Sequence, residues 1–162
     1  YVLQQSEQFA QAAALFEELA DFEDAAPHAA YCKARQAELD KDYATALFAY
    51  QDAVDYEDAA TRLDSLQTQV YDHADELFAD GQYEEALNWF SLLGDYFDSP
   101  ARAKDCKNYV RDALYALADA ALANGDLQSA YDQFKGLSGY RDAEARATEI
   151  AAELGIDEGT TE

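Results

Sequence analysis

Methionine is absent from the 162-residue sequence, and proline, cysteine and tryptophan are rare, with two, two and one residues. The prolines are Pro27 and Pro100, so long stretches contain no proline, little glycine and few β-branched residues. Such stretches favour helix, and we expect an all-α chain. Because no methionine begins the sequence, we expect the natural start to lie upstream of Tyr1, where a signal or membrane anchor could stand.

Long apolar runs are also missing. No run approaches the roughly 18 apolar residues that a membrane span needs, and no basic segment precedes an apolar one near the start. We therefore expect no direct membrane insertion of this segment. Its compartment stays open between the cytoplasm and an extracytoplasmic position behind a missing N-terminal anchor.

Basic residues are scarce, since 11 lysines and arginines stand against 34 aspartates and glutamates, for a net charge of −23 at pH 7. The phosphates of nucleic acid and the surfaces of anionic membranes both need a basic face, so neither is expected as a partner. The acidic field permits a protein or peptide partner of basic character. Solubility alone is the alternative explanation of the charge.

Four copies of one pattern run along the chain. Each is counted from an alanine, and these origin alanines are Ala12, Ala46, Ala86 and Ala130. An aromatic residue follows four positions later, a small or apolar residue seven later, a second aromatic ten later and an aspartate twelve later. The aspartates are Asp24, Asp58, Asp98 and Asp142. Self-similarity at spacings of 34, 40 and 44 residues predicts a stack of repeats.

Each copy contains an apolar stripe of helical period, such as Phe9, Ala12, Phe16 and Leu19 in the first. We predict these helices near residues 8–20, 43–54, 82–93 and 126–138. Gly81 and Gly125 precede two of them, where the preceding helix would end. Glu7 and Lys41 stand at the equivalent places, so those turns should be less sharply defined.

The repeated aspartates are expected to be helix N-caps, whose carboxylates accept backbone N–H groups, with Pro27 and Pro100 in the first turns. The additional residues of the later copies fall in the helices that follow. Their apolar stripes run unbroken, which favours single long helices that overhang their partners. The stripes are Leu63, Leu66, Val70, Ala74 and Leu77, and Ala103, Cys106, Val110, Ala113, Leu117 and Ala121. We predict one domain over residues 1–154, with a last helix to about Leu154, and a flexible tail at 155–162.

The two cysteines occupy equivalent repeat positions, twenty residues after Ala12 and Ala86. Packed helices lie about 8–10 Å apart, so Cys32 and Cys106 should be about two helix layers apart. A disulfide needs Cα atoms within about 7 Å, and we therefore predict two free, buried thiols.

Helix pairs with this pattern resemble tetratricopeptide (TPR) repeats. The resemblance rests on a small residue twelve before the origin alanine, glycine five before, an aromatic three before, the alanine itself, an aromatic four after and a small residue seven after. It implies an α-solenoid, a right-handed stack of antiparallel helix pairs with about 8–9 helices. The chain departs from the family where aspartate replaces proline twelve residues after the origin, at the larger Leu93 and Leu137, and in its two overlong repeats.

The resemblance also implies a concave groove, lined by the first helix of each pair, that holds a peptide or partner protein. Its residues, carried over by position, are Tyr31, Arg35, Glu38, Tyr71, Asp75, Phe78, Tyr115, Asp119 and Leu122. Tyrosine and aspartate replace the lysine and asparagine that would grip an acidic C-terminus, so a chaperone-tail clamp is rejected. An acidic, tyrosine-lined groove suits a basic or aromatic segment. In the alternative interpretation the tyrosines fill the helix seams, with their hydroxyls at the surface.

Signatures of catalysis and of metal or cofactor binding are missing from the sequence. It has no glycine-rich phosphate loop, nucleophile elbow or His-Glu-x-x-His motif. His28 and Cys32 are four residues apart and would be half a metal site, but no second pair completes it. We expect no catalytic residue, no cofactor and no metal.

Three functions remain open. The leading hypothesis is a non-enzymatic protein-interaction scaffold, one section of a larger bacterial protein. The alternative is a structural spacer, in which the stack sets distance within a larger protein of the bacterial cell envelope. The third is an enzyme whose site is shaped by the overhanging helices.

Overall fold

The computed structural model describes residues 2–19 and 25–156. Within these ranges it contains eight helices and no strand, which confirms the all-α prediction. The helices are α1 (Val2–Glu18), α2 (Ala25–Asp40), α3 (Tyr43–Asp52), α4 (Ala59–Ala79), α5 (Tyr83–Leu92), α6 (Ser99–Ala123), α7 (Leu127–Gly136) and α8 (Ala143–Leu154). The right-handed superhelical stack stays a prediction. Phe22, Asp24 and residues 157–162 of the predicted tail lie outside the described residues.

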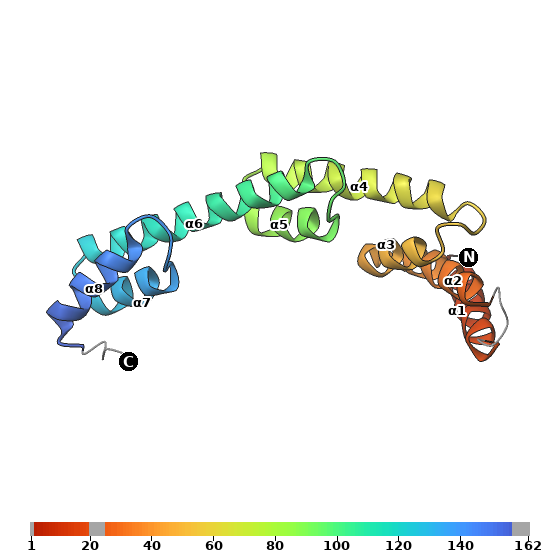
Figure 1. Cartoon of the computed structure of the whole chain (residues 1–162), viewed down its shortest axis with the longest axis horizontal. Helices are drawn as coiled ribbons and strands as arrows, with labels where there is room; N and C mark the ends of the chain where they lie inside the picture. The colour runs from red at the N-terminus through yellow and green to blue at the C-terminus, as the bar shows by residue number, and fades with distance from the viewer. Residues whose placement is uncertain (1, 20–24, 157–162) are drawn as a thin grey trace.

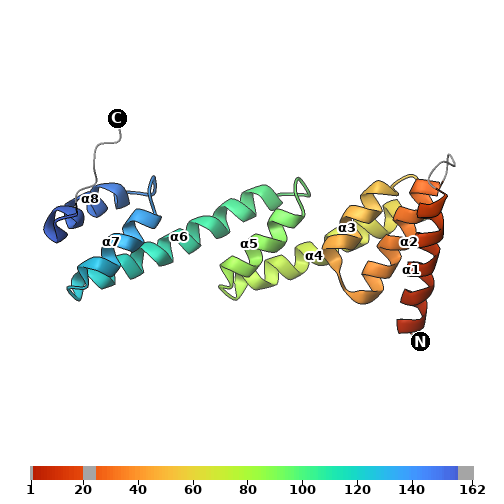
Figure 2. The same ribbon diagram turned by 90° about the horizontal axis from the view of Figure 1, so that it is seen from below.

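The helices form an extended, bowed row, with α1 and α8 at opposite ends of the bow (Figure 1). Helices α4 and α6 run along its outer side, and the short helices α3, α5 and α7 lie on its inner side (Figures 1 and 2). The TPR resemblance implied the opposite arrangement, with the first helix of each pair on the concave side. The short second helices therefore occupy the face where the sequence placed the groove.

Helices α4 and α6 each pack against two short helices, one along each half. We call a short helix together with the parts of the long helices that it contacts a packing unit. Arg62, in the first half of α4, reaches back to Glu38 of α2, whereas Ala74 in the second half packs into the core with α5. In α6, Cys106 belongs to one cluster of buried residues and Tyr115 to the next. The predicted single long helices are confirmed, and the predicted overhang is the start of the following unit.

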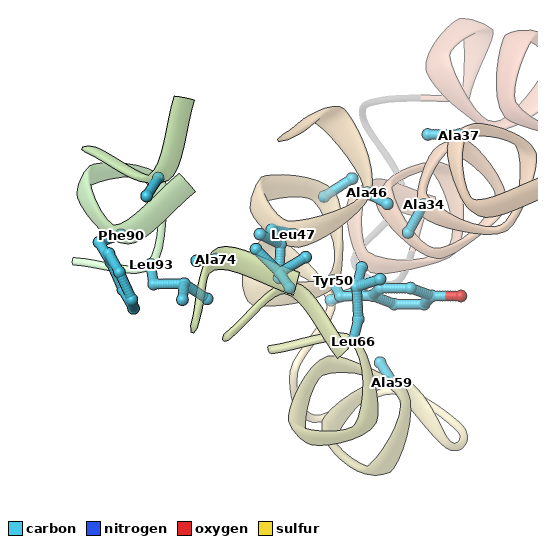
Figure 3. Packing of buried hydrophobic residues seen from close by; sticks show 14 of the residues in the cluster. Ala34, Ala37, Ala46, Leu47, Tyr50, Ala59, Leu66, Ala74, Phe90 and Leu93 are labelled. Carbon is cyan, nitrogen blue, oxygen red and sulfur yellow. The ribbon is translucent and has the colours of Figure 1, made fainter. Parts of the chain in front are cut away.

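Among the described residues, two clusters of buried side chains follow one another along the row. The first extends from Ala34 to Cys106 and contains the fully buried Tyr50 and Phe90 (Figure 3). The second extends from Tyr115 to Ala151, around the equally buried Phe134. The aromatic side chain four residues after Ala46, Ala86 and Ala130 is therefore fully buried at the centre of its unit. Phe16, four residues after Ala12, is only half-buried.

The apolar stripe predicted for α4 is buried at Leu66, Val70, Ala74 and Leu77. The stripe predicted for α6 is wrong in its middle, where Ala113 is exposed and Leu117 is 58% exposed. Between Cys106 of the first core cluster and Tyr115 of the second, α6 contributes no residue to either cluster. The middle of α6 has no short helix against it in Figure 2.

The turns before the short helices are better defined than the sequence suggested. Lys41 has a φ of 61°, in the left-handed region that Gly81 and Gly125 occupy with φ of 77°. The same backbone bonds close all three turns, as in Lys41 N–H to Glu38 C=O at 3.2 Å. The prediction of a looser turn at Lys41 is therefore wrong. At the first copy, Glu7 lies inside α1 and no turn is present.

The repeated aspartates begin their helices but do not cap them with their side chains. Asp58, Asp98 and Asp142 have φ near −100° and ψ near 17°, away from the extended conformation typical of an N-cap. None of the three carboxylates accepts a capping hydrogen bond from a backbone N–H of the first helical turn. Side-chain caps occur instead at the short helices, where Asp42 accepts from Thr45 N–H and Asp126 from Ser129 N–H.

Both cysteines are free thiols, as predicted. Cys106 is fully buried, whereas Cys32 is only half-buried, so the prediction of two buried thiols is wrong for Cys32. Burial raises the pKa of both thiols. Among the helices of the described ranges, none is both long and apolar enough to cross a bilayer.

Candidate functional site

The three predicted groove tyrosines lie at the seams between successive long helices, namely α2, α4, α6 and α8. Each donates a hydroxyl hydrogen bond to the aspartate that begins the next long helix, 27 residues further along. The pairs are Tyr31–Asp58, Tyr71–Asp98 and Tyr115–Asp142. The oxygen–oxygen distance is 2.6 Å in the first pair and 2.5 Å in the second. We call this repeated contact the Tyr–Asp clasp.

The rings of these tyrosines also have partners within the chain. Tyr115 is buried and the other two tyrosines are half-buried. Each ring packs edge-on against the aromatic residue at the centre of its unit, with centroids 5.4 to 6.2 Å apart. This is the seam-filling arrangement that the sequence left as an alternative.

Most charged residues of the predicted groove are paired inside the chain as well. Arg102 of α6 contacts Asp75 of α4, and Arg146 of α8 contacts Asp119 of α6. In the first unit the acid is Glu38, which lies 3.4 Å from Arg62 and 3.5 Å from Arg35. The arginine four residues after the clasp aspartate thus makes a second link between long helices.

The clasps shift the pKa of Asp58, Tyr71, Tyr115 and Asp142. The hydroxyl of Tyr115 holds the pKa of Asp142 below its ordinary value, and Tyr31, followed by Arg62, lowers the pKa of Asp58. In the opposite direction, hydrogen bonding to Asp142 raises the pKa of Tyr115, and Asp98 does the same for Tyr71. The contact therefore favours ionised aspartate beside neutral tyrosine.

We expect Tyr115→Phe to raise the pKa of Asp142 towards the ordinary value of about 3.9. In the native chain the lowered pKa of Asp142 stabilises the fold above about pH 4, and this contribution is lost as the pH falls through the folded-state value. The raised pKa of Tyr115 stabilises it below about pH 10 and is lost above that. A carboxyl NMR titration measures the shift. Tyr109→Phe is the control, and an equal shift there would contradict the assignment.

The two apolar residues of the predicted groove have different surroundings. Leu122 packs against the second core cluster. Phe78 is half-buried beneath the guanidinium of Arg102, 4.1 Å from its ring centre, and contacts the rings of Tyr83 and Tyr109. Phe78 thus lies beside a second surface, that of Tyr83 and Tyr109, which was not predicted from the sequence.

Two clefts lie where a short helix meets the middle of a long one. The first cleft, of about 590 Å³, has α4 as its floor and residues of α3 and α5 as its walls. The second cleft, of about 510 Å³, lies between the start of α5 and the middle of α6. Tyr43 and Tyr83, which occupy equivalent repeat positions, each line one of them.

The second cleft combines an apolar floor with an acidic rim. The rings of Tyr83 and Tyr109 stack with centroids 4.5 Å apart and an angle of 11° between their planes. Leu114 and Leu117, 43% and 58% exposed, continue the apolar surface along α6. The rim carries exposed carboxylates at Glu84 and Glu85. No lysine or arginine is among the described residues that line the second cleft.

Sequence reasoning placed Ala113 and Leu117 in the core because they share a helical stripe with Cys106. Period alone says which residues share a face of a helix and not whether another helix covers that face. The feature of the sequence that could have indicated the uncovered face is the length of the helix. Helix α6 has 25 residues against 21 in α4, about one additional turn between the two short helices.

His28, which with Cys32 would have been half of a metal site, lies among aromatic rings. The ring of His28 lies 4.8 Å from that of Phe16 and 4.2 Å from that of Tyr56. Within residues 2–19 and 25–156, no group of three or more His, Cys, Asp or Glu side chains is placed to hold a metal ion.

Comparison with protein-family models, curated proteins and solved structures finds no match to this chain.

Proposed function

We propose that the chain is a non-enzymatic protein-interaction scaffold that uses the second cleft to hold a partner. The observation that supports this most is the uncovered apolar surface of Tyr109, Leu114 and Leu117. Exposed leucines that continue a stacked aromatic pair form a patch, and patches rimmed by polar residues are typical of interaction sites. The TPR resemblance supports the same class of function, with the partner on a different face.

The partner we propose is a helical segment with an apolar face flanked by lysine or arginine. Its apolar side chains would cover Leu114 and Leu117, and its basic side chains would meet Glu84 and Glu85. A helix laid into an apolar groove is a recurring mode of peptide recognition. The net charge of −23 would attract such a segment and speed its approach.

The residues predicted for the concave groove are less suited to this role. The hydroxyls of the three tyrosines already bind aspartate within the chain, and Asp75 and Asp119 are paired with arginine. A partner that used these groups would first have to open the contacts that join successive long helices. We therefore propose that the partner binds in the second cleft and that the clasps keep the row of helices rigid.

We expect a labelled peptide with leucines on one helical face and lysines beside them to bind the native chain. Leu117→Asp should weaken this binding at least about tenfold, or about 1.4 kcal/mol, because it places a carboxylate where leucine is covered. Fluorescence anisotropy measures the affinity. The fold should be unaffected, since the leucine is already exposed.

One control variant separates cleft binding from general attraction to an acidic protein, and one control peptide tests the need for basic side chains. Leu15→Asp adds the same charge at another exposed leucine, on α1, and should leave the affinity unchanged. A peptide with glutamate in place of lysine should bind far more weakly. Equal losses in Leu15→Asp and Leu117→Asp would show that the second cleft is not the binding surface.

The structural spacer remains the second candidate, because one feature favours it. Helices α4 and α6 are each continuous between two packing units, and clasps bridge successive long helices. Such a row would hold its ends at a fixed separation. Failure of every amphipathic peptide in a displayed library to bind would leave the spacer as the better proposal.

A further inference from the structure

The first cleft differs from the second in the chemistry of its walls. Trp89 of α5 and Tyr43 of α3 stand with ring centroids 6.4 Å apart and planes inclined at 55°, so that they form an aromatic corner. The ring of His73 meets Trp89 edge-on at 5.5 Å. Both corner residues are half-buried and pack against the first core cluster, which fixes their positions.

Two carboxylates share the first cleft with the aromatic corner. Asp72 and Glu76 lie one helical turn apart on α4, and both are exposed. The other residues that line this cleft are neutral polar or apolar, apart from His73, and no described lining residue is lysine or arginine. A volume of about 590 Å³ leaves room for a small organic group.

An aromatic corner beside carboxylates selects for a cation with an apolar surface. The face of an indole or phenol ring attracts positive charge, and it does so best when the cation is weakly hydrated. Carboxylates add long-range attraction without requiring a hydrogen bond from the ligand. A metal ion would instead need several convergent oxygen or nitrogen ligands, which the described residues do not supply.

From this geometry we infer that the first cleft is a binding site for an alkylated ammonium group, held by Trp89, Tyr43 and the carboxylates of Asp72 and Glu76. The group belongs to a small molecule such as choline or to an alkylated lysine of a protein. This site is separate from the second cleft, so this inference does not depend on the peptide-binding proposal.

The chain reports on the first cleft directly, because Trp89 is its one tryptophan. Titration with choline should change the intrinsic fluorescence with a dissociation constant in the range of about 1–10 mM. The uncharged carbon isostere, 3,3-dimethylbutanol, should bind at least about tenfold more weakly at the same ionic strength. A short peptide with one trimethyllysine, compared with its lysine counterpart, forms the second arm. Tighter binding of the trimethyllysine peptide than of choline identifies a protein source, and the reverse identifies a small molecule.

Matched variants locate the binding in the first cleft. Glu76→Gln should weaken choline binding about threefold and Tyr43→Leu about tenfold, with the fold checked by circular dichroism. Asp64→Asn, which removes one charge from the same helix outside the first cleft, should have no effect. The inference is overturned if the isostere binds as well as choline, if no change occurs up to about 50 mM, or if Asp64→Asn weakens binding as much as Glu76→Gln does.

Discussion

Ala113→Pro is expected to divide the unfolding of this chain into two transitions. Ala113 lies in α6 between Cys106, which belongs to the first core cluster, and Tyr115, which belongs to the second. Proline inside a helix removes one backbone hydrogen bond and clashes with the preceding turn, at a cost of about 3 kcal/mol or more. Because Ala113 is exposed, the substitution removes no core packing. The substitution therefore destabilises the helix where it continues from one cluster to the other.

Continuity of α6 is what couples the two clusters in this structure. A repeat array unfolds cooperatively when the interfaces between its units are strong, and separates into steps when they weaken. The native chain should show one calorimetric transition. The proline variant should show two, or one whose calorimetric enthalpy clearly exceeds the van't Hoff value.

Ala113→Gly is the matched control for this experiment. It lowers helix propensity by about 1 kcal/mol but keeps the backbone bond and adds no clash, so a single transition should remain. Small-angle scattering should also detect a kinked row in the proline variant only. A single transition in Ala113→Pro, with stability close to that of the native chain, would show that the clusters are coupled by contacts other than the shared helix.

The sequence predicted the packing registers of the fold because these depend on local period. The origin alanines Ala46, Ala86 and Ala130 are fully buried, and so are the aromatic residues four positions after them. Ala12 is the exception and is only half-buried. Its helix α1 stands at the end of the row, where it packs mainly against α2, and a repeat pattern carries no record of which copy is terminal.

The partner of each repeated aspartate could not be read in the same way. An aspartate at the start of a helix has a local partner by rule, namely the backbone of the first turn. In this fold Asp58, Asp98 and Asp142 bind a tyrosine 27 residues earlier. The tyrosine register and the aspartate register are both visible in the sequence. Their contact follows only once the long helices are known to lie side by side.

The second cleft lies away from the groove predicted from the sequence, for a related reason. Position in a resembling repeat family placed the groove on the long helices, where Tyr71 and Asp75 stand. The resemblance does not account for the greater length of α6, which leaves Leu117 without a covering helix. The uncovered surface is therefore a product of the departures from the repeat, at positions that vary between copies.

Phe90→Ala is expected to lower the free energy of unfolding by about 3–5 kcal/mol, which is the usual cost of deleting a buried phenyl ring. Phe90 is fully buried, packs edge-on against Tyr71 at 5.6 Å and lies under the guanidinium of Arg102 at 5.4 Å. Loss of the ring therefore leaves a cavity and also loosens two groups that join α4 to α6. For a chain of this size the melting temperature should fall by about 6–20 °C, measurable by circular dichroism.

Phe97→Ala provides a control with the same substitution a few residues away. Phe97 is 76% exposed, and its ring contacts those of Tyr71 and Tyr96 edge-on. Its loss should cost less than about 1 kcal/mol. Hydrogen exchange adds the location, because Phe90→Ala should weaken protection in α4 and α5 more than in α7 and α8, which belong to the second cluster. Equal loss of protection in all four helices would mean that exchange needs global unfolding, with no partial opening confined to the first cluster.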